Sequence, residues 1–111
     1  MAQNFRRYKE SAIGTSATDI PNGSNFDSYD TIVGISLANI LTNTIKVDVY
    51  IANGGTNYYL VKTAPIPSGG ALQVLDGGAK VVVESGDRLY IKSDTASSVD
   101  AWVSAVDAIS T

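Results

Sequence analysis

The 111-residue chain predicts an all-β protein: one two-layer antiparallel β-sandwich of about eight strands, jelly-roll or immunoglobulin-like. Two observations lead to this prediction. Several short segments alternate strictly between apolar and polar residues, which is typical of half-buried strands. Glycine-containing turn signals separate these segments about every ten residues, which leaves no room for long helices. The length is that of one domain, residues 1–111, and a fold of this size hides roughly two thirds of its extended surface.

The clearest strands are residues 45–51 and 88–93. Side chains of a strand point alternately to its two faces. In the first strand we expect Val47 and Val49 to face inward, and Lys46, Asp48 and Tyr50 to face outward. In the second we expect Leu89 and Ile91 to face inward, and Arg88, Tyr90 and Lys92 to face outward.

Three further segments, residues 30–39, 56–63 and 80–84, are rich in the branched and aromatic residues that strands favour. In the first of them the pattern places Val33, Ile35 and Leu37 on one face. Residues 98–109 fit the period of a helix as well as that of a strand, because their apolar residues form a helical stripe in one case and a strand face in the other. We predict a strand with Val99, Ala101, Val103 and Ala105 on one face, since it completes the sandwich.

Turns and loops are expected between the strands. Asn-Gly-Gly and Asp-Gly-Gly sequences supply residues that adopt positive φ where the chain reverses. They stand at residues 53–55 and 76–78, with related signals at 68–70 and 85–87. Pro65 and Pro67 predict a loop or an edge crossing over residues 64–67. Residues 19–30 are expected to form a long polar loop.

Composition and charge exclude several classes of function. The chain has no Cys and no His, so disulfide scaffolds, thiol nucleophiles, Ser–His–Asp triads, haem and the usual zinc sites are excluded. Eight basic residues oppose eleven acidic ones and lie mostly singly, so we expect no nucleic-acid partner. No apolar run approaches the ~20 residues of a membrane span, and the polar, basic N-terminus is not typical of a secretory signal.

We expect no catalytic residues, no metal site and no cofactor. The paired glycines lack the Gly-Lys-Ser/Thr ending of a phosphate-binding loop. Most aspartates fall in turns or on an exposed strand face, where a carboxylate is simply solvated. The loop at residues 19–30 carries five side chains with oxygen ligands, but it lacks the spacing and closing Glu of an EF-hand, so an Asx-rich turn is the better interpretation.

The candidate partner-binding residues are aromatic and basic. Tyr50 and Tyr90 lie on outward faces, where a ring with a polar tip suits a subunit interface or a sugar ring. Residues 1–12 are predicted as an N-terminal arm or an edge strand. Ordering a polar arm costs about 1–2 kcal/mol per residue, and the arm cannot bury enough of its own surface to offset this cost. We therefore expect Phe5, Arg6, Arg7 and Tyr8 to contact another chain. In the competing interpretation the segment pairs within its own sandwich. Trp102, among Ala, Val and Ser, is interpreted as a packing residue.

Four stretches of the chain carry a family resemblance. They are Gly34 with Leu37-Ala38-Asn39, Tyr59-Leu60-Val61-Lys62 with Ile66-Pro67-Ser68-Gly69, Glu84-Ser85-Gly86-Asp87, and Ser93-Asp94-Thr95-Ala96-Ser97-Ser98. Nearly the whole chain resembles small virion structural proteins of tailed phages, especially those that infect cyanobacteria. The resemblance implies a β-sandwich located in the virion, as a capsid decoration (cement) protein or a neck or tail accessory subunit. It transfers no functional residue.

Two classes of function follow from this resemblance. The first is a structural subunit that binds other virion proteins and copies of itself. The alternative is a host-attachment or carbohydrate-binding module of a phage tail or fibre, in which Tyr and Asn side chains contact a cell-surface glycan. A small hydrolase is a distant third.

Overall fold

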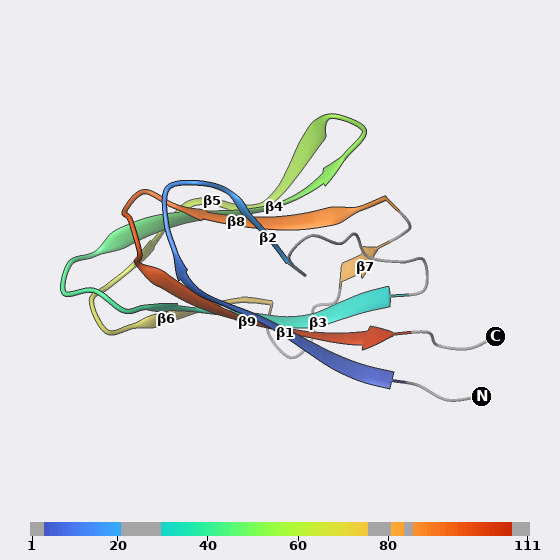
Figure 1. Cartoon of the computed structure of the whole chain (residues 1–111), viewed down its shortest axis with the longest axis horizontal. Coiled ribbons are helices and arrows are strands. Elements are labelled where there is room, and N and C mark those ends of the chain that lie inside the picture. Colours follow the sequence, from blue (N-terminus) through green and yellow to red (C-terminus); the bar gives the residue numbers. More distant parts are fainter. Residues whose placement is uncertain (1–3, 21–29, 76–80, 84–85, 108–111) are drawn as a thin grey trace.

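The computed structural model describes residues 4–20, 30–75, 81–83 and 86–107, and these form an all-β sandwich of nine strands (Figure 1). None of the described residues is helical, and they contain no helix that could cross a membrane. The strands are β1 (Asn4–Ile13), β2 (Thr18–Ile20), β3 (Asp30–Asn39), β4 (Ile45–Asn53), β5 (Thr56–Ile66), β6 (Ala71–Leu75), β7 (Val81–Val83), β8 (Arg88–Ser93) and β9 (Val99–Asp107).

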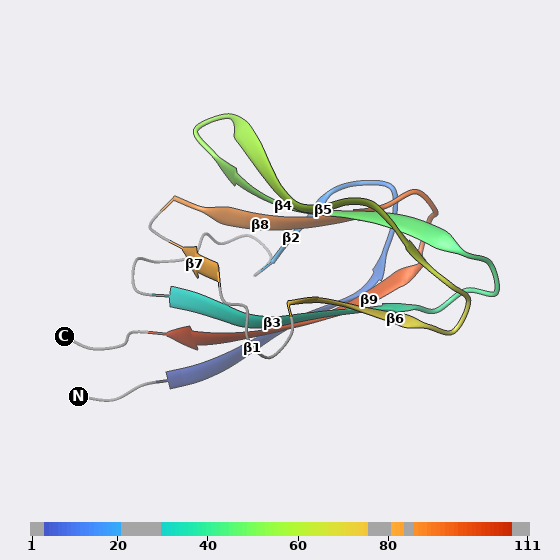
Figure 2. The same cartoon turned by 180° about the vertical axis from the view of Figure 1, so that it is seen from behind.

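The two sheets pack face to face, as both views of the ribbon show (Figures 1 and 2). One sheet has the order β1-β9-β3-β6, with β7 also pairing β3, and the other has the order β2-β8-β4-β5. Because β6 and β7 pair with different parts of β3, they occupy one strand position. The pairs β1·β9, β2·β8, β3·β6/β7 and β4·β5 are then nested from the ends of the chain inward. This nesting is the rolled-up order of a jelly roll and differs from the immunoglobulin order.

The core follows the predicted alternation. Val47 and Val49 are buried, whereas Lys46 is exposed and Asp48 half-buried. Leu89 and Ile91 are buried from β8. Residues 99–107 form a strand, and its predicted inner face is confirmed by the burial of Val99, Ala101, Val103 and Ala105.

One face assignment was wrong, in β3. Ile32 is fully buried and Val33 only half-buried, although Val33 was expected to share a face with Ile35 and Leu37. Ile32 pairs with Ala105 and Gly34 with Ser104, so Val33 is an extra residue in the ladder. Such a β-bulge moves the alternation by one position, and local periodicity cannot reveal it.

Two loop predictions also need correction. The segment 64–67 was expected to be a loop or an edge crossing between the sheets, but β5 continues through Pro65 to Ile66, and the chain crosses to the other sheet only afterwards, between β5 and β6. Pro65 is tolerated because β5 is the outermost strand of its sheet, where a backbone N–H can point to solvent. The polar loop expected at 19–30 is shorter than predicted, because Asp19 and Ile20 belong to β2 and Asp30 belongs to β3. Residues 21–29 lie outside the described part of the chain.

The N-terminal segment is an edge strand of its own sandwich. Residues Asn4 to Glu10 pair with Asp107 to Ala101 of β9, and Tyr8 packs against the core. Pairing with β9 therefore accounts for the order of this segment without a second chain. A partner contact through Phe5, Arg6, Arg7 and Tyr8 stays a prediction, and Arg7 is exposed.

The outer strands of both sheets bend at similar bulges. Opposite Asp100 of β9, strand β1 carries an extra residue, and the N–H of Ala12 (φ 55°) donates to Oδ1 of Asp100 over 3.0 Å. Opposite Asp48 of β4, strand β5 does the same, and the N–H of Thr63 (φ 54°) donates to Oδ1 of Asp48 over 2.7 Å. In each case an aspartate on the inner neighbour binds the backbone that the bulge leaves unpaired.

Candidate functional site

The outer face of the sheet β2-β8-β4-β5 carries three tyrosines in a row, here called the tyrosine ladder: Tyr90, Tyr50 and Tyr59. The sheet register places them there, because Tyr50 of β4 lies directly opposite Tyr90 of β8 and Tyr59 of β5. The rings of Tyr50 and Tyr90 are stacked with centroids 5.4 Å apart, and those of Tyr50 and Tyr59 are tilted with centroids 5.0 Å apart. Cross-strand aromatic pairs of this kind stabilise the sheet and present a row of phenol groups.

Charged groups stand at both ends of the ladder. The ammonium of Lys62 lies 4.5 Å from the centroid of the Tyr59 ring, within the range of a cation–π contact. At the other end, Nη1 of Arg88 lies 3.3 Å from Oδ2 of Asp19 in an ion pair. The ladder is thus bordered by cations that bind an aromatic face or a carboxylate.

The surroundings of the middle phenol of the ladder raise its pKa. Desolvation is the largest cause that raises the pKa of Tyr50, and the neighbouring Tyr59, Tyr90 and Asp48 raise it further. A phenol with the ordinary pKa of 10.0 is already protonated near neutral pH, so the hydroxyl of Tyr50 is both a donor and an acceptor there, and the raised pKa extends this state to more alkaline solution.

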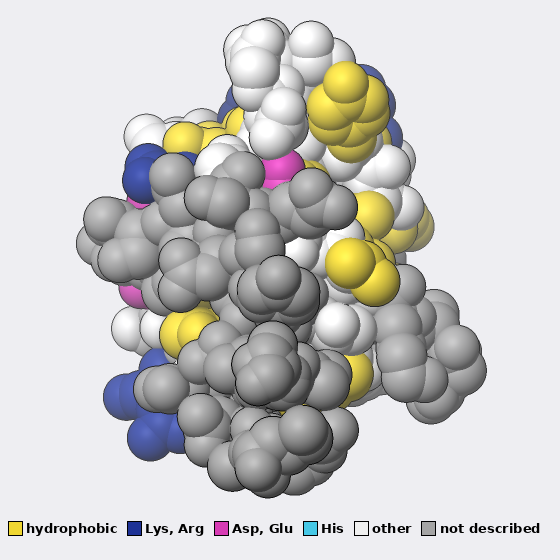
Figure 3. Space-filling model, turned by 90° about the vertical axis from the view of Figure 1, so that its right-hand side faces the viewer, with side chains coloured by type: hydrophobic (Ala, Val, Ile, Leu, Met, Phe, Trp, Pro, Cys, Tyr) yellow, Lys and Arg dark blue, Asp and Glu magenta, His cyan; other side chains and the backbone are white. Residues whose placement is uncertain are grey.

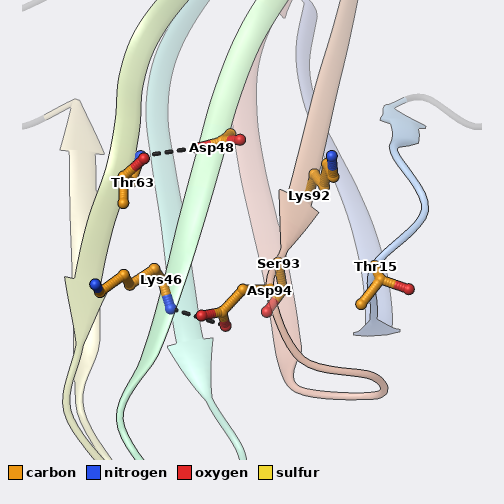
Figure 4. A pocket seen from close by; sticks show the side chains of 7 residues that line it. All are labelled: Thr15, Lys46, Asp48, Thr63, Lys92, Ser93 and Asp94. Carbon is orange, nitrogen blue, oxygen red and sulfur yellow. Dashed lines mark hydrogen bonds between the residues drawn. The ribbon is translucent and has the colours of Figure 1, made fainter.

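A polar hollow of about 420 Å³ lies on the same face, beside the ladder (Figure 4). Asp48 and Lys92, which line it, stand two positions before Tyr50 and two after Tyr90 in their strands. The two lysine side chains of the hollow, Lys46 and Lys92, point away from each other in Figure 4. The full lining is Thr15, Lys46, Asp48, Thr63, Lys92, Ser93 and Asp94.

The carboxylates of this hollow hold backbone in place. Oδ1 of Asp48 accepts the N–H of Thr63, and Oδ1 of Asp94 accepts the N–H of Lys46 at 3.1 Å and the hydroxyl of Thr95 at 2.9 Å. The backbone hydrogen bond from Lys46 is the main cause that lowers the pKa of Asp94. A carboxylate kept ionised in this way is a poor general acid. The described residues include no group of three or more Asp, Glu, His or Cys side chains that could hold a metal ion.

The outer face of the other sheet carries Trp102, which sequence analysis assigned wrongly to packing. Its side chain is 49% exposed, and the guanidinium of Arg7 lies 5.2 Å from its ring centroid. The residues directly opposite Trp102 on the neighbouring strands are Lys9 of β1 and Ser36 of β3. The signal was available in the sequence, because Trp102 falls out of phase with the buried Ala101 and Val103.

The six residues predicted to bind partners do not form one site. Tyr50 and Tyr90 meet on one sheet, as expected from their outward phase. Arg7 lies on the opposite outer face and Tyr8 turns toward the core. Phe5 and Arg6 pair with Val106 and Ala105 through their backbone, but their side chains lie outside the described part of the structure. Sequence reasoning missed Tyr59 and Lys62, because the bulges of β5 interrupt its alternation.

Aromatic groups thus occupy two opposite outer faces of one sandwich. Each face also has a hollow, and the one beside Trp102, of about 340 Å³, is lined by Lys9, Glu10, Ser11, Asp100, Ala101 and Trp102. Comparison with protein-family models, with curated proteins and with solved structures finds no match to this chain.

Proposed function

We propose that this protein is a structural component of a tailed-phage virion, a capsid decoration (cement) or neck–tail accessory subunit that acts through protein–protein contacts. The observation that carries the proposal is the resemblance of nearly the whole chain to small virion proteins. The jelly-roll order supports it only by analogy, since this architecture recurs in viral capsid and lectin domains and a fold does not fix a function.

The placement of the aromatic residues supports a role in assembly. Tyr and Trp are enriched at protein interfaces because a rigid ring buries a large apolar area while its polar tip keeps a hydrogen bond. Here the tyrosine ladder and Trp102 lie on opposite sheets. A subunit built in this way contacts neighbours on two sides and needs no chemistry to do so.

Locating the protein on intact particles tests the proposal. We expect mass spectrometry to detect the chain in density-purified virions, at a copy number that fits a symmetric station, and electron microscopy to place it there. A chain that is abundant in the infected-cell lysate but missing from purified particles would contradict the proposal.

Glycan binding by a host-attachment module is the second candidate, and the ladder beside the polar hollow is the observation that favours it. Phenol rings and hydroxyls next to ammonium and carboxylate groups are suited to bind a sugar. The test is a glycan array with the purified protein, with Tyr59→Ala as the ladder variant and Trp102→Ala as the matched aromatic control. Binding that Tyr59→Ala removes and Trp102→Ala retains would favour this candidate over a purely structural role.

A further inference from the structure

The outermost strand β5 differs in character between its two halves. An exposed sheet edge is a template for another strand, and proteins protect it with bulges, prolines and charged side chains. The half nearer the C-terminal end of β5, residues 61–66, has all three protections. It contains Lys62, Pro65 and the bulge at Thr63.

The other half of β5, residues 56–59, has none of these protections. It pairs in regular register with β4, from Asn53 opposite Thr56 to Tyr50 opposite Tyr59. It contains no charge and no proline, and Tyr58 and Tyr59 are 61% and 43% exposed. The β4–β5 hairpin projects from the sandwich, and hydrophobic side chains reach the surface near its end (Figures 1 and 3).

Strand β1, which forms one edge of the other sheet, is protected. It carries the charged residues Arg7, Lys9 and Glu10, followed by the bulge at Ala12. Segment 56–59 is therefore a neutral, regular and aromatic stretch of edge, and the contrast with β1 points to a binding role.

We propose that segment 56–59 pairs antiparallel with the same segment of a second copy of this chain, with residues 57–59 in direct register, joining two four-stranded sheets into one. This inference rests on the proposed assembly function and names the surface that it uses. A twofold axis perpendicular to such a sheet places one residue opposite itself. With Tyr58 at that position, Asn57 faces the partner's Tyr59.

The absence of charge in segment 56–59 is compatible with pairing to a second copy. Because the paired residues carry no charge, no like charges are directly opposed. Lys62 lies beyond the paired segment, toward the partner's turn at Gly54 and Gly55, which is also uncharged. Tyr58 gains an aromatic cross-strand partner at the axis. On the other face of the joined sheet each tyrosine ladder ends opposite the partner's Asn57, so the two Tyr59 side chains lie diagonally across the axis.

A cysteine at the axis tests this geometry directly. The chain has no Cys, so Tyr58→Cys introduces a single thiol that faces its own copy across the axis. We expect disulfide-linked dimers to form rapidly under mild oxidation. The protein concentration must be high, because an edge contact this small is weak. Val82→Cys, at a position that is 72% exposed on β7, is the matched control and should cross-link far more slowly. Equal cross-linking of the two variants would overturn the proposal.

Charge reversal supplies the second test, measured by sedimentation velocity of the full chain. Tyr58→Lys and Tyr58→Glu should each lose the dimer, because each places like charges opposite one another, and their equimolar mixture should restore it as a heterodimer. Val82→Lys should leave the dimer intact. A mixture that stays monomeric overturns the proposal.

The tests distinguish this inference from the proposed function. If the protein is found on virions but wild type is monomeric and Tyr58→Lys reduces its incorporation, the edge binds another virion protein and the second copy is excluded. If dimers form as expected and the chain is absent from virions, the pairing stands and the virion function fails.

Discussion

Asp48 and Asp100 control where the outer strands bend. Each accepts a hydrogen bond from the N–H of a residue with positive φ, Thr63 or Ala12. A non-glycine residue in this region costs about 1–2 kcal/mol, so the bulge needs a compensating interaction. A hydrogen bond to a charged acceptor supplies one.

Replacing Asp48 by Ala should lower the free energy of unfolding by about 1 kcal/mol, because the Thr63 N–H loses its protein acceptor. Asp48→Asn keeps an oxygen at the same position and should cost clearly less. Urea denaturation of both variants measures the difference. Equal effects would show that the charge itself, and not the acceptor, stabilises the bulge.

Asp94 should make stability depend on pH in the acid range. Its pKa in the folded state is lowered from the ordinary value of 3.8, chiefly by the hydrogen bond from the Lys46 N–H. The folded state therefore favours the ionised form; this stabilisation is present above the ordinary pKa and is lost as pH falls through the lowered one.

Asp94→Asn retains an acceptor for the Lys46 N–H but cannot ionise. The difference in unfolding free energy between wild type and Asp94→Asn should favour wild type at about pH 6 and shrink by about pH 3. Denaturant titrations at the two pH values measure this difference. A difference that is independent of pH would contradict the assignment.

At the scale of elements, β4 shows how alternation fixes a strand between two layers. Its inner residues Val47 and Val49 are buried, whereas Lys46 faces solvent. Val49→Asp should prevent folding, because an unpaired buried charge costs an amount comparable to the whole stability of a domain, about 5–15 kcal/mol. Lys46→Glu is the control and should change stability by less than about 1 kcal/mol. Circular dichroism and thermal melts of the two variants test the register, and a larger loss in Lys46→Glu would show it to be wrong.

Strand β1 belongs to the sandwich, and its removal should unfold the protein. Deleting residues 2–9 removes most of the ladder to β9 and the contact of Tyr8 with the core. We expect loss of the cooperative thermal transition. Deleting residues 2–3, which stops short of β1, should leave the transition nearly unchanged. If the variant that lacks residues 2–9 melts like wild type, β1 is a dispensable arm and not a necessary part of the sandwich.

For the whole molecule, the nested strand pairs make folding depend on distant contacts. The pair β1·β9 joins Asn4 to Asp107, and β2·β8 joins Thr18 to Ile91. Pairings so far apart in sequence must close long loops, so refolding should take milliseconds to seconds, as in other all-β domains.

Joining the two ends of the chain should speed folding. Asn4 lies opposite Asp107, so a short peptide linker can close the backbone and turn β1·β9 into a local hairpin. Stopped-flow refolding should be faster for the cyclised chain than for the linear chain with the same linker left open, and the melting temperature should rise. Equal refolding rates would mean that β1·β9 forms after the rate-limiting step.

Local sequence was enough for the strands whose alternation is unbroken. Residues 45–51 and 88–93 were placed with the correct faces, and Tyr50 and Tyr90 were found because both fall on the outward phase. For residues 98–109 the apolar pattern fitted a helix as well as a strand, and the strand was preferred because it completes the sandwich. Once the segment is a strand, its phase places Trp102 on the face opposite to the buried Ala101 and Val103.

Local sequence failed where a bulge or a distant partner decides the outcome. Ile32 is buried where Val33 was expected, because the bulge in β3 shifts the alternation of side chains by one residue. Tyr59 was assigned to neither face of its strand, because a bulge in β5 interrupts the alternation in the same way. Whether the N-terminal segment was an arm or a strand depended on β9, some ninety residues away along the chain.

The sequence by itself determined that this protein is an all-β sandwich with a valine- and isoleucine-rich core, because side-chain alternation is a local property of a strand. Only the tertiary structure decided the jelly-roll order, the joining of three tyrosines into a ladder and the position of segment 56–59 at a sheet edge. These depend on which strands lie side by side, and that choice is made by burial and backbone pairing between segments far apart in the chain.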